Sequence, residues 1–236
     1  MNVHKIRFGD EGQAATRDLL QQFDSLGARV PRVGSPVMEK LRGELKTLEA
    51  IDRQYGGTGT LPLEDAGELA AATLADLARL ENDCRHESEE ALLAIAHLTI
   101  GVALWAVRHG MVLTVAEPVT NALAHISNAA GSRAELSAVF GVMQGVIENV
   151  RPVLEADLER SDPQRPWRLL HVNLAITAVR TEDSRLMELA FDALDAALPD
   201  ERAGFYAEAL CVAMGPKVAA NVREAIERRH GRFNLS

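Results

Sequence analysis

The stretch GSRAELSAVFGVMQGVIENV, residues 131–150, contains both a helix start and one face of a helix. Ser132 and Glu135 form a capping box, in which the Ser hydroxyl accepts from the third helical N–H and the Glu side chain reaches back to the helix start. We expect Gly131 to end the preceding helix in the left-handed conformation. The apolar residues that follow recur at steps of three and four, which predicts one long amphipathic helix: Leu136, Val139, Phe140, Met143, Val146, Ile147 and Val150.

Similar boundaries recur along the chain. Gly110 is predicted to end one helix, and Thr114 and Glu117 form a second capping box that starts the next. Gly215 and Pro216 place a helix end directly before a helix start. No two β-branched runs are joined by an Asn-Gly or Asp-Gly turn, so strands are not expected. We predict an all-α protein.

The predicted boundaries have a regular spacing. Thr181 and Gly215 are 34 residues apart, and Pro199 and Gly231 are 32 apart. This length is typical of helical hairpins that stack into a solenoid, although the tetratricopeptide consensus is absent around either tryptophan. We therefore expect an array of antiparallel helical hairpins, α-solenoid-like in geometry. A multi-helix bundle is the alternative, because short connectors also make neighbouring helices of a bundle antiparallel.

The glycine-rich segment GGTGT, residues 56–60, is predicted to be a linker. It lacks the Lys-Ser/Thr pair and the preceding strand of a phosphate-binding loop. We place a domain boundary there, with a helical hairpin in residues 1–55 and the main helical array in residues 61–236.

Composition narrows the classes of function. The 236 residues carry a formal net charge of −9, which argues against a nucleic-acid partner. Cys84 and Cys211 match no metal or redox spacing, and we expect free thiols, with Cys84 in a surface turn. The N-terminal residues do not resemble a secretory signal, so a cytoplasmic location is expected. The apolar run from Ala91 to Val107 is interpreted as a buried core helix and not as a membrane span.

The polar residues that could bind a metal are His86, Glu90 and His97. They share one helical face, but His86 and His97 are about 16 Å apart along a helix, which is too far for one ion. We therefore favour a solvated segment around His86 and Glu90, with His97 as a hydrogen-bonded core histidine, and we expect no cofactor.

The candidate groove or pocket residues are Asn121, His125 and His171, polar side chains on otherwise apolar helices. Arg228 and Arg229 are expected to complement the dipole at the end of the last helix. Together these features favour a non-enzymatic interaction module or adaptor that binds a protein or peptide, with a homo-oligomer left open. The alternative is a helical enzyme, or a small-ligand or metal-binding protein, with a pocket between helices.

Overall fold

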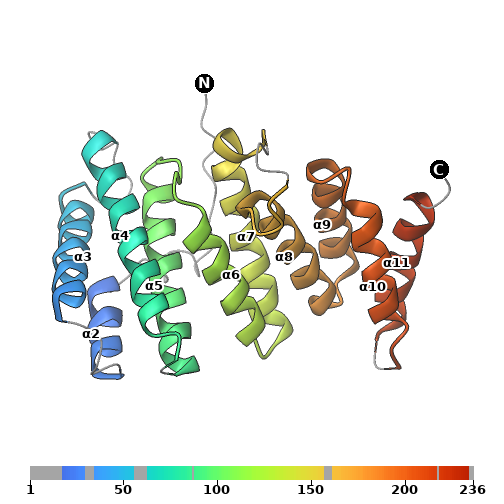
Figure 1. The fold of residues 1–236 in the computed structure, drawn as a ribbon, viewed down its shortest axis with the longest axis horizontal. Helices are drawn as coiled ribbons and strands as arrows, with labels where there is room; N and C mark the ends of the chain where they lie inside the picture. Colours follow the sequence, from blue (N-terminus) through green and yellow to red (C-terminus); the bar gives the residue numbers. More distant parts are fainter. Residues whose placement is uncertain are drawn as a thin grey trace. The chain divides into compact units, whose positions relative to one another are not determined.

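A computed structural model describes residues 18–29, 35–55, 63–86, 88–156, 161–216 and 218–233 of the chain (Figure 1). These residues form helices without any strand, which confirms the all-α prediction. The helices are α2 (Leu19–Arg29), α3 (Ser35–Tyr55), α4 (Leu63–Asp83), α5 (Glu89–Arg108), α6 (Glu117–Ala129), α7 (Arg133–Leu154), α8 (Pro166–Thr181), α9 (Ser184–Ala197), α10 (Arg202–Ala213) and α11 (Ala220–Phe233).

The predicted capping box starts α7. The backbone N–H of Glu135 donates to Ser132 Oγ at 3.2 Å, and the Glu135 carboxylate accepts from the N–H of Gly131 at 2.8 Å. The prediction of a left-handed Gly131 was wrong, because Gly110 is the only glycine with positive φ among the described residues, at φ +79. Gly110 follows the end of α5 and needs this conformation, whereas the connector before α7 turns without it.

The predicted cap at Thr114 is not the start of α6. This helix begins at Glu117, so Ala116 directly precedes it, and the carbonyl of Ala116 accepts the backbone N–H of Thr120. Pro118 lies in the first helical turn, where its missing N–H leaves no helical bond unmade.

The chain divides into two compact units. The first contains α2 to α6 together with residues 148–153, and the second contains residues 130–147 and α8 to α11. The predicted linker, residues 56–60, lies outside the described residues, so the predicted boundary there stays a prediction.

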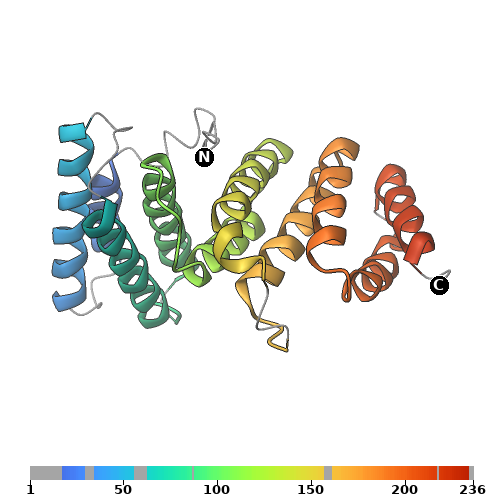
Figure 2. The ribbon, with the colours of Figure 1, turned by 90° about the horizontal axis from the view of Figure 1, so that it is seen from above.

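In the first unit, consecutive helices from α2 to α6 pack on one another, and α2 also contacts α5 (Figures 1 and 2). Helix α5 is apolar on nearly all sides and is covered by α2, α4 and α6, so its residues 98–107 are all buried. By length and composition α5 is the one described helix that could cross a membrane, and two thirds of its apolar window is buried by protein. The predicted core helix is therefore observed in the structure.

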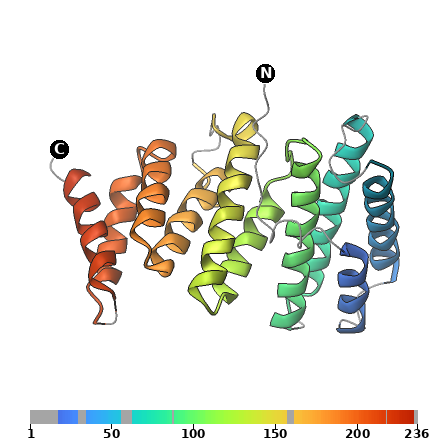
Figure 3. The same cartoon turned by 180° about the vertical axis from the view of Figure 1, so that it is seen from behind.

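In the second unit, α8 packs on α9 and α10 packs on α11, and α9 also contacts α11 (Figure 3). The aromatic centre of this unit is Tyr206 on α10, which meets Phe191 of α9 edge to face and stacks on Phe233 of α11. These three rings hold α9, α10 and α11 around one core.

The tight turn between α8 and α9 is centred on Glu182, which has φ 56 although it is not glycine. Its side chain pairs with Arg133 of α7, and its carbonyl accepts from Asn221 of α11 at 2.8 Å. Asp183 then caps α9 by accepting the backbone N–H of Arg185 at 2.8 Å. A single turn thus bonds to two helices that are distant in the sequence.

Candidate functional site

The residues considered for metal binding do not form a metal site. His86 and Glu90 are both exposed; His86 lies in the turn that follows α4, and Glu90 lies in the first turn of α5. His97 is exposed and its Nδ1 lies 2.8 Å from the Leu93 carbonyl, so its interpretation as a core histidine was wrong. Within the described ranges no group of three or more His, Cys, Asp or Glu could hold an ion.

The candidate groove residues fall into both units. Asn121 is exposed on α6, and His125, one turn later, is partly buried with its Nε2 3.3 Å from a Glu89 carboxylate oxygen. His171 lies in the second unit, where it is buried with Nδ1 2.8 Å from the Trp167 carbonyl. Of the three, Asn121 is exposed, the His125 side chain is 23% exposed and His171 is buried, so the role of these residues as a groove stays a prediction.

A second buried histidine, His109, joins α5 to α3. Its Nε2 lies 2.6 Å from Asp52 Oδ1, while Arg108 binds the other oxygen of the same carboxylate. The His109 ring also lies 4.6 Å from the Trp105 ring, centroid to centroid. The imidazole is fully buried, while the Arg108 and Asp52 side chains are each 24% exposed, so this cluster links two helices at the edge of the core.

Two buried carboxylates lie side by side between α3 and α4. Lys40 pairs with Asp76 and lies 3.6 Å from Glu44, and Arg79 binds Asp76 at 3.1 Å. Burial, and then the neighbouring charge of Asp76, raise the pKa of Glu44 above that of an ordinary glutamate, although Lys40 opposes this rise. Lys40 and Arg79 are largely exposed, so the two carboxylates carry most of the burial cost.

An ionic cluster of four side chains is centred on Arg229 of α11, whose side chain is only 4% exposed. Its guanidinium donates to Glu188, Asp192 and Asp195, which lie at successive turns of α9. Burial opposes the charged form, but these hydrogen bonds outweigh it and raise the pKa of Arg229. From the sequence, Arg229 was expected to complement the helix dipole, and its pairing with three acids of α9 was not predicted.

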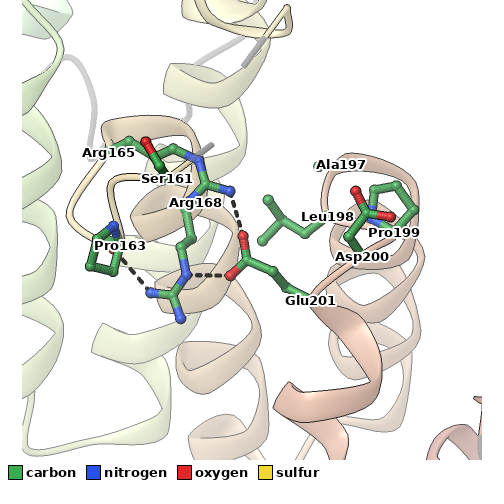
Figure 4. Close-up of a pocket in the computed structure, with 9 residues that line it drawn as sticks. All are labelled: Ser161, Pro163, Arg165, Arg168, Ala197, Leu198, Pro199, Asp200 and Glu201. Atoms are coloured by element: carbon green, nitrogen blue, oxygen red, sulfur yellow. Dashed lines mark hydrogen bonds and ion pairs between the residues drawn. The ribbon is translucent and has the colours of Figure 1, made fainter. Parts of the chain in front are cut away.

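Figure 4 shows a cleft in the second unit between the start of α8 and the start of α10. Its volume is about 260 Å³. Arg165 and Arg168 each bind one oxygen of the Glu201 carboxylate, so this acid bridges the two guanidinium groups. Sequence reasoning missed this site, because only the fold brings Glu201 to residues more than thirty positions earlier.

Helix α10 exposes an unusual face. Its exposed residues recur at helical spacing and carry one charge, that of Glu208; with the adjoining Met214 we call them the α10 face: Gly204, Ala207, Glu208, Cys211, Val212 and Met214. Val212 is 74% exposed and Met214 is 64% exposed, the two highest values among the large apolar side chains of the described residues. An exposed apolar face on a short helix is a typical protein contact surface.

The cysteines differ in environment. Cys211 is exposed on the α10 face, whereas Cys84 is fully buried, which corrects its prediction as a surface residue. Neither cysteine forms a disulfide, in agreement with the sequence-based expectation.

Comparison of the chain with protein-family models, with curated proteins and with solved structures found no match.

Proposed function

We propose that this protein is a non-enzymatic interaction module that binds a protein or peptide partner through the α10 face. The observation that carries the proposal is the exposure of Val212 and of the adjoining Met214 on the α10 face, where Glu208 is the one charged residue. Exposed apolar side chains at helical spacing favour binding, because covering them with another helix or an extended segment lowers the free energy.

A comparison of the apolar helices α5 and α10 supports this proposal. Helix α5 is also apolar along its length, and other helices cover nearly all of it. In helix α10 only Tyr206 and Ala213 are fully buried, and among the described helices α11 is the one that packs extensively on it. The apolar character of α5 is explained by the core, whereas that of α10 calls for an external partner.

We further propose that the second unit is built as stacked hairpins of the solenoid kind. The pairs α8 with α9 and α10 with α11 would be two such hairpins, and the contact between α9 and α11 supports stacking through their second helices. In such arrays the exposed helix faces commonly form the partner-binding surface.

Site-specific photo-crosslinking in the native cell tests the proposal. A photoreactive residue at position 212 should capture one defined protein, and the same residue at the exposed position Ser137 of α7 should not. Adding Met214→Glu should abolish the crosslink while leaving the thermal midpoint unchanged, because Met214 is mostly exposed. Equal capture at both positions, or capture that survives Met214→Glu, would contradict the proposal.

A further inference from the structure

The cleft at the start of α8 contains two arginines, and each has a hydrogen bond to a backbone carbonyl in addition to its bond to Glu201. Arg165 donates to the Asp162 carbonyl at 2.9 Å, and Arg168 donates to the Pro163 carbonyl at 3.1 Å. The turn that supplies these carbonyls is itself fixed, because Asp162 accepts the backbone N–H of Gln164 at 2.8 Å. The two guanidinium groups are therefore held in place from their own side of the cleft.

Positive groups gather around one carboxylate in the cleft. Arg165 is buried, and both arginines converge on the one carboxylate of Glu201. Helix α8 starts beside them with Pro166 and without a side-chain cap, so its positive dipole end adds to their field. Asp200 also lines the cleft, but Figure 4 shows it on the side away from the two arginines.

The contact is open to solvent on one side. Arg168 and Glu201 each keep about a third of their side-chain surface exposed, at 30% and 33%. Glu201 directly precedes α10, but its side chain makes no capping hydrogen bond to that helix. Its carboxylate binds the two arginines instead.

We propose that Arg165 and Arg168 form a carboxylate-binding site, and that Glu201 is its tethered internal occupant. A ligand bearing a carboxylate, such as an acidic side chain of a partner, displaces Glu201 and takes its two oxygen positions. The site reads a carboxylate because each arginine binds a different oxygen of one planar group. This proposal is independent of the α10 face, since it concerns other residues and another ligand chemistry.

Because Glu201 is part of the same chain, it competes strongly with an added carboxylate, and binding is best measured in a variant without this acid. A carboxylate linked to its own site by a short chain acts at an effective concentration of the order of millimolar or more. Glu201→Gln removes this competitor and keeps the shape of the side chain. The variant should melt at a lower temperature than the wild type, and acetate or glutarate should restore the loss in a saturable manner at constant ionic strength.

The expected result is an apparent affinity for acetate about tenfold or more higher in Glu201→Gln than in the wild type. Adding Arg168→Gln should remove the response. Glu182→Gln is the matched control, because it removes the partner of a single exposed arginine, Arg133, and acetate should not restore its stability.

Three outcomes would overturn the proposal. The first is a Glu201→Gln response no larger than that of Glu182→Gln, which would make the contact a simple link between helices. The second is an equal response to inorganic phosphate, which would mean that the cleft senses charge and not carboxylate shape. If Glu201→Gln does not fold, the Arg168 Nε resonance of the wild type decides: a saturable shift with acetate supports the site, and a flat or linear titration refutes it.

Discussion

Replacement of Arg229 by methionine should destabilise the second unit by about 2 to 3 kcal/mol. The bond to Asp195, an acid that is only 14% exposed, is expected to contribute most, about 1.5 to 3 kcal/mol as a charge-assisted hydrogen bond. The bonds to Glu188 and Asp192 contribute less, since these carboxylates are 41% and 70% exposed and pairs in water contribute about 0 to 1 kcal/mol each. Methionine offsets part of the loss, because no guanidinium then needs to be buried.

Urea unfolding measures this change if the signal comes from the second unit alone. A Trp105→Phe background leaves Trp167, which lies in that unit, as the only tryptophan. Double-mutant cycles with Asp195→Asn and Asp192→Asn then separate the bonds, and the coupling to Asp195 should be the larger. The conclusion that the bond to the more buried acid, Asp195, contributes most would be refuted by equal coupling to both acids. A change of less than about 0.5 kcal/mol for Arg229→Met would also refute it.

The other predictions concern a buried acid, a turn and the thiols. Folding raises the pKa of Glu44, so the stability of the wild type should fall as pH rises above the ordinary glutamate pKa of 4.5. The stability of Glu44→Gln relative to the wild type should therefore increase between pH 4 and pH 7. Parallel pH profiles of the unfolding free energy for the two proteins would contradict this. Gly110→Ala should cost about 1 kcal/mol or more in urea unfolding because its φ is positive, whereas Gly131→Ala should be nearly neutral; equal costs would be inconsistent with the observed turns. A thiol reagent should label Cys211 in the folded protein and Cys84 only after unfolding, as peptide mapping would show; labelling of both at one rate would mean that Cys84 is not buried.

Features set by neighbouring residues could be predicted from the sequence. The capping bond from Glu135 to Ser132 and the buried stripe of α7 depend on residues within one helix, so spacing alone identifies them. The conformation of Gly131 could not be predicted from neighbouring residues in this way. Its conformation depends on the path of the connector, and a glycine beside a cap does not reveal the sign of φ.

Features set by distant residues could not be predicted in the same way. Arg229 meets acids 34 to 41 residues away, and Glu201 meets arginines 33 and 36 residues away. The acids at Glu188, Asp192 and Asp195 do follow helical spacing, and this acidic stripe was a signal for a basic partner. The identity of that partner depends on which helix packs against α9, which no local pattern gives.

The turn at Glu182 has a consequence for the order in which the second unit folds. Helices α8 and α9 are joined by two residues, so their hairpin closes at little cost in chain entropy, while the bonds from Arg133 and Asn221 close loops of 49 and 39 residues. The hairpin is therefore the expected nucleus, and α7 and α11 attach to it later from opposite directions along the chain. Substitutions in the α8 and α9 interface should slow folding, whereas Arg133→Ala and Asn221→Ala should mainly speed unfolding.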